Sequence, residues 1–398
     1  MVAQRRALAV VAAGQLFALS LWFSASAVAP QLRDLWGLST GEEAGLTLAV
    51  QVGFVVGALV SAILNLADIV PSRRLFSISA ISGAAANLGL LAMGPETVSL
   101  ALGLRFLTGF FLAGVYPSGL KVMSGWFKQG RGMALGVLVG ALTVGSATPH
   151  LVRGVGLEWE GVVVAASLLT VMSAFLMRAV GDGPHEVAAQ KFRWRQVALV
   201  VQNRGVRLST LGYLGHMWEL YAMWTWMAAF LAASAIESGV GYGSVSLITF
   251  SVIAIGGLGS WWAGILADRI GRTRVAGGAM VISGSCALAT ALVFGSTPWI
   301  VVPLSLIWGL TVVADSAQFS TMVTETAEDE IRGTALTLQT AVGFLLTLVT
   351  IRGVPALAES IGWRWAFPAL ALGPAFGVAA MVRLARSPMA ARLAEGRG

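Results

Sequence analysis

Ionisable side chains inside long apolar runs are the residues of this sequence best placed to do chemistry. Glu219 lies within the run 209–235, one helical turn after His216. Asp315 lies within the run 299–320. An acid in such surroundings costs about 3 kcal/mol and is rarely tolerated unless it handles ions or protons. We therefore predict that Glu219 takes up and releases a proton and that Asp315 is a second titratable acid. The alternative for Asp315 is a structural role as a helix cap.

Arg105 lies in another apolar run, 97–118, and its guanidinium keeps its charge at any physiological pH. Such a group is suited to hold a carboxylate through two parallel hydrogen bonds, or to bias the protonation of an acid nearby. Tyr116 falls on the same helical face as Arg105. We predict that both side chains contact a substrate. The alternative is a permanent structural ion pair between Arg105 and Glu219 or Asp315.

Two helical faces carry polar and aromatic side chains suited to line a substrate path. Successive residues of an α-helix turn by about 100°, so residues three or four apart share a face. Around Glu219 this face contains His216, Met223 and Trp226, and in the first apolar run it contains Gln15, Trp22 and Ser26. We predict one cavity between the two faces. The alternative is a membrane-interface belt of aromatic residues with an ordinary buried histidine.

The composition indicates that most of the chain lies in a membrane, because 57% of the residues are apolar and only 11% are charged. A helix needs about 20 apolar residues to cross a hydrocarbon layer about 30 Å thick. Runs of this length predict an all-α polytopic membrane protein with twelve transmembrane helices, and proline predicts kinks in three of them, at positions 117, 149 and 303. The predicted spans are 7–30, 43–66, 75–94, 97–118, 131–152, 161–179, 209–235, 241–265, 275–295, 299–320, 333–352 and 365–384.

The basic residues sort to one end of these predicted helices. With the N-terminus inside, the outer side carries Arg33, Arg153, Arg352 and Arg364, and the inner segments hold nearly all the others. An excess of Lys and Arg on cytoplasmic loops predicts a multi-pass protein of the cell membrane with both termini in the cytoplasm. The net charge of +7 therefore predicts contact with membrane lipids and not with nucleic acid.

Cysteine and histidine are too sparse in this sequence for a metal centre or a metal-dependent enzyme. Cys286 is the single cysteine, and His150, His185 and His216 are widely separated. The sequence also contains no nucleotide-binding loop. We therefore predict no cofactor, no metal and no enzymatic activity. The first apolar run is a full span and not a cleavable signal peptide.

The two halves of the chain repeat each other at an offset of 200 or 201 residues. The matched positions include Asp68 with Asp268, Gly109 with Gly309, and 131–135 with 332–336. Such a repeat predicts two pseudo-symmetric six-helix bundles, at 1–180 and 209–398, joined by a cytoplasmic linker at 181–208. Within this linker, the basic and aromatic piece 191–195 suits the plane of the lipid headgroups.

The turn from Gly264 to Arg274 reads Gly-Ile-Leu-Ala-Asp-Arg-Ile-Gly-Arg-Thr-Arg and resembles, at every position, the signature loop of the major facilitator superfamily. The resemblance implies two six-helix repeats with the substrate at their interface. It also implies that Asp268 closes an inner gate by accepting from the next helix or from arginines of the inner loops. The first-half copy around Asp68 is degenerate. The predicted gate residues are Gly264, Asp268, Arg269, Arg272, Asp68, Arg131 and Arg332.

Arg105, followed by Thr108 and Gly109, resembles the fourth-helix motif of proton-coupled members of this superfamily. With the loop 126–132, it is similar to the branch that contains nitrate/nitrite porters, cyanate permease-like proteins and organic-anion symporters. Nitrate porters bind their anion with arginines in the second and eighth spans, where this sequence has none. We therefore predict a monomeric, proton-coupled symporter of a small organic anion that works by alternating access. The alternatives are a proton-driven exporter of amphipathic compounds and an inorganic anion porter of the nitrate, nitrite or cyanate type.

Overall fold

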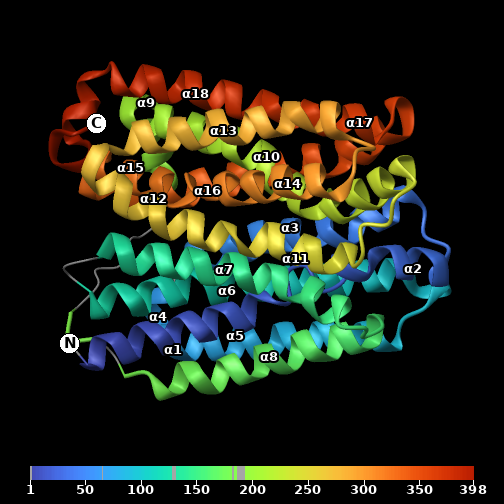
Figure 1. Cartoon of the computed structure of the whole chain (residues 1–398). Coiled ribbons are helices and arrows are strands. Elements are labelled where there is room, and N and C mark those ends of the chain that lie inside the picture. The colour runs from blue at the N-terminus through green and yellow to red at the C-terminus, as the bar shows by residue number, and fades with distance from the viewer. Residues whose placement is uncertain (1, 65, 128–130, 182, 186–192) are drawn as a thin grey trace. The chain divides into compact units, whose positions relative to one another are not determined.

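The structure is a computed structural model that describes the chain except for residues 1, 65, 128–130, 182 and 186–192. For residues 67, 68, 131 and 132 it describes the backbone only. The side chains of Asp68 and Arg131, two of the predicted gate residues, therefore lie outside the described residues. The described part of the chain consists of helices and their connections, without a strand (Figure 1).

The α-helices of the first half are α1 (Val2–Leu19), α2 (Ala29–Trp36), α3 (Thr40–Ile63), α4 (Leu66–Ile69), α5 (Ser72–Leu88), α6 (Val98–Trp126), α7 (Arg131–Gly154) and α8 (Trp159–Ala179). Those of the second half are α9 (Val197–Gln202), α10 (Arg204–Ser238), α11 (Val245–Ala254), α12 (Gly256–Ile270), α13 (Arg272–Val293), α14 (Pro298–Val312), α15 (Ser316–Thr326), α16 (Asp329–Ile361), α17 (Trp363–Ala366) and α18 (Leu372–Ala385). Short 3-10 helices are η1 (Ser26–Val28), η2 (Gly89–Ala92), η3 (Pro95–Thr97), η4 (Trp194–Gln196), η5 (Phe367–Ala371) and η6 (Pro388–Gly396).

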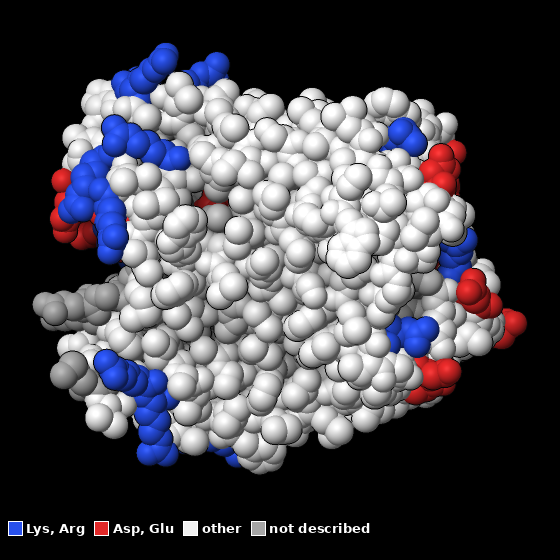
Figure 2. All heavy atoms as spheres, in the orientation of Figure 1, with Lys and Arg blue, Asp and Glu red and all other residues white. Residues whose placement is uncertain are grey.

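Among the described residues, 10 helical stretches are long and apolar enough to cross a membrane. The other two predicted spans correspond to α1, which begins with the charged residues Arg5 and Arg6, and to α10, which is 35 residues long and rich in polar-tipped aromatic side chains. On the face shown in Figure 2, charged side chains gather at the ends of the helices and are scarce between them. The prediction of an all-α polytopic fold with twelve membrane helices is therefore confirmed.

The chain forms two compact units, Met1–Ala189 (unit 1) and Gln190–Gly398 (unit 2). Their boundary falls within the segment 181–208 that the sequence predicts as a linker. The second part of that segment is already helical, because α9 and the first turn of α10 lie in it. Six of the membrane helices belong to each unit.

The helices of the two units pack in the same order. In unit 1, α6 packs against α3 and α5, α1 packs against α7 and α8, and α5 packs against α8. In unit 2, α14 packs against α11, α12 and α13, α10 packs against α16 and α18, and α13 packs against α18. Helices separated by about half of the chain therefore have equivalent neighbours, as the internal repeat predicts.

The repeat extends to single helix contacts. A Cβ atom at Gly109 would overlap the carbonyl oxygen of Val50, and one at Gly309 would overlap that of Val252. Small residues allow the backbones of membrane helices to approach this closely. The match of Gly109 with Gly309 in the sequence thus corresponds to the same kind of helix crossing in each unit.

Three of the predicted spans are interrupted where the sequence contains no proline. The interruptions lie at residues 20–25, at Ile255 and at residues 313–315. By contrast, α6, α7 and α14 each remain helical through the proline predicted to kink them. Neighbouring helices and side chains can satisfy the backbone groups that a proline or a break leaves free. Where a span breaks therefore depends on its neighbours.

Candidate functional site

Arg105 on α6 is fully buried and is bonded to the interruption of the first span. Its Nη2 donates to the carbonyl oxygen of Trp22 at 2.7 Å, and its Nη1 donates to that of Leu21 at 3.2 Å. Its Nε donates to the carbonyl oxygen of Leu46 on α3, also at 3.2 Å. The guanidinium therefore donates to two carbonyl groups that lie outside regular helix, those of Leu21 and Trp22, which explains how the break at 20–25 is tolerated.

A small polar network completes the surroundings of Arg105. Its Nη1 also donates to the Oδ1 of Asn87 at 2.9 Å and to the Oγ of Ser24 at 3.0 Å. The Nδ2 of Asn87 in turn donates to the Oγ of Ser167 on α8 at 3.0 Å. Every described partner of Arg105 is neutral, so within the described residues of unit 1 its positive charge is compensated by hydrogen bonds and not by an acid.

The other predicted substrate residues of unit 1 are placed as follows. The ring of Trp22 packs against Phe54, with 4.9 Å between ring centroids, and the Oγ of Ser26 lies 2.5 Å from the Oγ1 of Thr47. Both contacts join the first span to α3. Gln15 is fully buried, and its amide has no hydrogen-bond partner among the described residues. Tyr116 is half-buried farther along α6.

Glu219 on α10 is buried in unit 2 with 2% of its surface exposed. Its Oε1 accepts a hydrogen bond from the indole Nε1 of Trp308 on α14 at 2.7 Å. Its Oε2 accepts from the Oγ of Ser283 on α13 at 2.9 Å. The carboxyl group is thus oriented by two neutral donors, and no Lys or Arg of the described chain is bonded to it.

His216 and Asp315 form a second buried pair in unit 2. The Nδ1 of His216 lies 2.7 Å from the Oδ1 of Asp315, and both side chains are nearly inaccessible. Asp315 lies in the interruption of the tenth span and makes no capping hydrogen bond to α15, so its side chain does not act as the helix cap considered above. The Nε2 of His216 has no hydrogen-bond partner among the described residues.

The predicted face of α10 contacts several different helices. Trp226 donates from its Nε1 to the carbonyl oxygen of Ile351 on α16 at 2.9 Å, and Met223 is fully buried. Glu219 faces α13 and α14, whereas His216 faces the start of α15. Unit 2 therefore holds two separate polar centres, one at Glu219 and one at His216 and Asp315. The cavity predicted between the faces of α1 and α10 would need residues of both units, and it stays a prediction.

The signature loop is a helix–turn–helix in which Gly271, at φ +103°, separates α12 from α13. The Nη2 of Arg272 lies 3.2 Å from the Oδ1 of Asp268 and 2.8 Å from the Oε1 of Glu325. Asp268 therefore accepts from the side chain of the first residue of α13 and not from its backbone N–H. Gly264 is buried in α12 and Arg269 is exposed.

The C-terminal segment contacts this loop. The Nη1 of Arg397 donates to the carbonyl oxygen of Asp268 at 2.5 Å, and the backbone N–H of Ala394 donates to the Oε2 of Glu325 at 3.1 Å. Arg332, the remaining predicted gate residue, pairs with Asp329 and donates to the carbonyl oxygen of Thr324. These partners all lie in unit 2.

Sequence reasoning did not select several of the polar groups that organise these centres. They are Asn87, Ser283, Trp308 and Glu325. Asn87 was the easiest to find, because an amide in the middle of an apolar run needs a partner. The indole of Trp308 and the hydroxyl of Ser283 gave no such signal, because both residue types are common in membrane helices.

Two comparisons with known proteins show which family and which solved structure this chain is similar to. Residues 11–243 match the Major Facilitator Superfamily. The fold is similar to the crystal structure of a bacterial homolog of the human lysosomal transporter Spinster, in an inward-facing and occupied conformation, with a TM-score of 0.69, 14% identity, and 95% of this chain and 96% of that chain covered. No curated protein sequence matches significantly.

The family match covers more than half of the chain, and the structural similarity at 14% identity extends it, as a fold, over nearly the whole length. Neither comparison assigns the chain to the nitrate, cyanate and organic-anion branch, which stays a prediction. Members of the family carry small molecules across membranes. On the evidence of its two six-helix units, its signature loop and this match, the chain belongs to the Major Facilitator Superfamily and is a multi-pass membrane transporter.

Proposed function

We propose that the protein is a proton-coupled secondary transporter in which buried acids of unit 2 carry the proton. The observation that supports this best is that Glu219 and Asp315, each 2% exposed, have no Lys or Arg among their described bonding partners. Ionisable groups in membrane helices face the protein interior and commonly mark paths for ions or protons. A purely structural acid would instead be expected to pair with Lys or Arg, whose charge is permanent, whereas the partner of Asp315 is the titratable His216.

His216 is suited to pass the proton to and from Asp315. A neutral imidazole has one nitrogen that donates and one that accepts, so it can take a proton on one side and release it on the other. Its Nδ1 lies against Asp315, and its Nε2 is free of described partners. Glu219 follows His216 by one turn of α10, which places two proton acceptors one helical turn apart.

For the substrate we propose a small organic anion that moves together with the proton. Arg105 supports this through its charge, because its described partners are hydrogen-bond acceptors without a negative charge, so no described acid neutralises it inside the membrane. Charge attraction is stronger in a medium of low dielectric constant than in water. Since the donors of Arg105 are bonded to the protein, the attraction would act at a distance and not through the two-bond contact predicted from the sequence.

A proton-driven exporter of amphipathic compounds is the second candidate, and Glu219 favours it. When ionised, Glu219 attracts cations, because its described partners, Trp308 and Ser283, carry no positive charge. A binding assay that compares small carboxylates with lipophilic cations separates the two proposals. Stabilisation by carboxylates supports the symporter, and stabilisation by the cations alone supports the exporter.

The coupling proposal is tested in two steps. A thermal-shift screen of the purified protein against small metabolites first identifies a substrate. Its uptake into proteoliposomes is then measured with and without a pH gradient, for wild type, Glu219→Gln, Asp315→Asn and the control Glu237→Gln. Glu237 lies on the same helix but is exposed at its end, 3.8 Å from Arg364.

We expect the control to concentrate substrate in response to the gradient as wild type does. Glu219→Gln should bind and exchange substrate while losing accumulation driven by the gradient. If both Glu219→Gln and Asp315→Asn still concentrate substrate, the buried acids of unit 2 do not carry the proton and the proposal is wrong.

We also propose that both termini lie in the cytoplasm, from the placement of the basic residues. After removal of Cys286, cysteines introduced at Gly239 and Thr297 should react with an impermeant reagent from outside. Gly239 ends α10 and Thr297 precedes α14. Reaction only after the membrane is opened would reverse the orientation.

A further inference from the structure

The segment 193–207, which leads into α10 and includes its first turn, carries arginines that form no ion pair with a described acid. These residues are Arg193, Arg195, Arg204 and Arg207. Large apolar side chains are exposed among them, namely Trp194 at 67%, Leu199 at 53% and Val201 at 54%. Basic and apolar side chains that are exposed together are typical of a helix that lies at a membrane surface.

This segment is anchored on α16. The backbone N–H of Arg193 donates to the Oγ1 of Thr334 at 3.0 Å, and that hydroxyl donates to the Oε1 of Gln196 at 3.1 Å. At the other end, the side chain of Asn203 caps α10 by accepting from the backbone N–H of Val206 at 3.0 Å. The arginines therefore occupy a defined position beside α10 and α16.

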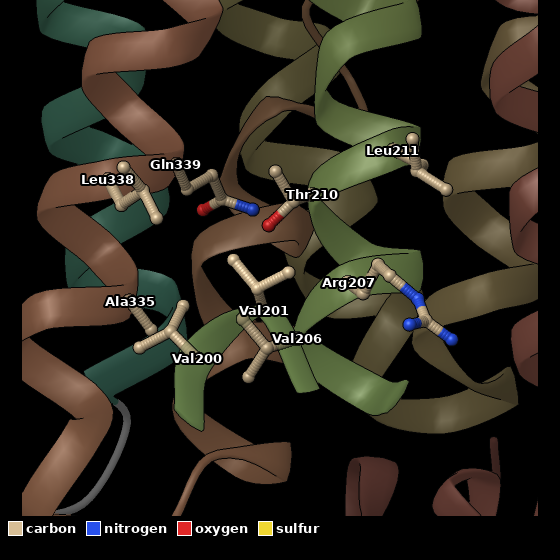
Figure 3. A pocket seen from close by; sticks show the side chains of 9 residues that line it. All are labelled: Val200, Val201, Val206, Arg207, Thr210, Leu211, Ala335, Leu338 and Gln339. Atoms are coloured by element: carbon tan, nitrogen blue, oxygen red, sulfur yellow. The ribbon is translucent and has the colours of Figure 1, made fainter. Parts of the chain in front are cut away.

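A pocket of about 110 Å³ lies between α9, α10 and α16, next to these arginines. Most of its wall is apolar and consists of Val200, Val201, Val206, Leu211, Ala335 and Leu338. Figure 3 shows the amide of Gln339 turned toward Thr210 inside the pocket, whereas the guanidinium of Arg207 points away from Gln339. The aliphatic part of the Arg207 side chain thus lines the pocket, and its guanidinium lies outside it.

Gln339 is the residue of this pocket whose unsatisfied hydrogen-bond donor indicates a ligand. It is 1% exposed, and its Nε2 has no hydrogen-bond partner among the described residues. A buried donor without an acceptor costs about 1–3 kcal/mol. An acceptor that enters the pocket with an apolar group attached would remove this cost.

We propose that an anionic phospholipid binds here, with its phosphate near the arginines and the first part of one acyl chain in the pocket. A pocket of this volume admits a few methylene groups and not a whole acyl chain. An ester carbonyl at the top of the chain would accept from the Nε2 of Gln339. Clusters of basic residues on an interfacial helix are suited to anionic lipids.

Glu328, an acid bonded to this segment through Asn203, already has a basic partner of its own. Glu328 accepts from the Nδ2 of Asn203 at 3.0 Å and lies 3.5 Å from Arg392. A hydrogen bond from its own backbone N–H, and then those from Asn203 and Arg392, lower the pKa of Glu328 from its ordinary value. Glu328 is therefore ionised at neutral pH but already has a basic partner, which leaves the arginines available to a phosphate.

The test measures thermal unfolding of the whole protein in detergent during titration with short-chain phosphatidylglycerol, phosphatidylcholine or free glycerol phosphate. Phosphatidylglycerol should raise the unfolding temperature most, because only it combines a net negative charge with an acyl chain. Arg204→Gln with Arg207→Gln should weaken its binding roughly 30-fold, since each arginine near an anionic surface contributes about 1 kcal/mol and 1.4 kcal/mol is a factor of ten.

Matched variants distinguish the contribution of the arginines to lipid binding from the contribution of the pocket. Arg383→Gln with Arg386→Gln removes two exposed arginines at the end of α18 and should leave lipid binding unchanged. Gln339→Leu should stabilise the lipid-free protein, because it removes an unpaired buried amide, and should reduce the stabilisation by lipid. Equal stabilisation by phosphatidylcholine, equal stabilisation by glycerol phosphate, or a wild-type response of the Arg204 and Arg207 variant would each overturn the proposal.

Discussion

The two units share one helix arrangement but differ in the charge that each buries. Unit 1 buries Arg105, whose described partners are all neutral and which bridges a break in the first span. Unit 2 buries Glu219, Asp315 and His216, which stand on α10 and at the break in the tenth span. The charge of Arg105 is fixed, because arginine does not release its proton in a protein, although unit 1 also buries the titratable His150. The groups of unit 2 can change their charge.

This difference indicates that the two units, although they pack their helices in the same order, have different roles. The polar centre of unit 1 has its donors bonded to the protein and therefore stabilises a local structure. The polar centres of unit 2 include an imidazole nitrogen without a described partner and two acids that have no Lys or Arg partner among the described residues. Pseudo-symmetry in packing thus does not imply symmetry in chemistry, and variants of the two units should behave differently.

Replacement of Arg105 should give the largest effect. Arg105→Met leaves the carbonyl group of Trp22 without its described donor, and breaking a buried charged network costs about 3–5 kcal/mol. Arg105→Lys keeps the charge with fewer donors and should lose less. The measurement is thermal unfolding in detergent, with Arg153→Met, at a half-buried arginine near the end of α7, as the control. A stable Arg105→Met variant would show that unit 1 does not depend on this residue.

Alanine at the paired glycines should destabilise both units alike. Gly109→Ala and Gly309→Ala force a methyl group against the backbone of a neighbouring helix, and such overpacking costs about 1–3 kcal/mol. Gly103→Ala on α6 and Gly278→Ala on α13 are the controls, because a Cβ meets nothing within 4 Å at either position. A large effect in one unit and none in the other would contradict the equivalence of the two crossings.

The signature loop should respond more to loss of Glu325 than to loss of Asp268. Glu325 accepts two hydrogen bonds from the Nε of Arg272 and one from the backbone of Ala394, and its side chain is 23% exposed. Asp268 is 53% exposed and has one contact with Arg272 at 3.2 Å. Exposed pairs contribute at most about 1 kcal/mol. Glu325→Gln should therefore lower the unfolding temperature by a few degrees, and Asp268→Asn by less.

If Asp268 gates the inner side, Asp268→Asn should slow transport more than Glu325→Gln does, although it lowers the unfolding temperature less. Asp268→Asn should then slow uptake at equal expression, although its stability is close to that of wild type. Uptake at the wild-type rate would remove Asp268 from the gate.

Neutralising Glu219 should have the smallest effect on stability. In Glu219→Gln the new amide oxygen can still accept from Trp308, and the new amide nitrogen can donate to Ser283, so the change should stay within about 1 kcal/mol. Thermal unfolding of this variant beside Arg105→Met tests the contrast directly. A loss as large as that of Arg105→Met would mean that Glu219 is as structural as Arg105.

Much of the fold was predictable because a membrane imposes a simple rule on sequence. The apolar runs gave the twelve helices, and the offset between Asp68 and Asp268 gave the repeat. The helix ends differ most where the interfacial parts are polar, as in α10, which begins at Arg204 and not at 209, and in α16, which continues to Ile361. Hydropathy reports the length that crosses the hydrocarbon and does not report the helix that continues into water.

The sequence alone determined which residues carry charge into the membrane, because an arginine or an acid in an apolar run is visible without any coordinates. Only the tertiary structure decided what those charges do, since their roles depend on partners far away in the chain. Arg105 could be assigned to the break in the first span only when the carbonyl groups of Leu21 and Trp22 were seen at its guanidinium. Glu219 and Asp315 could be separated into two centres only when Trp308 and His216 were seen beside them. A hydrogen bond acts over about 3 Å in space, and no periodicity along the chain records which helices come that close.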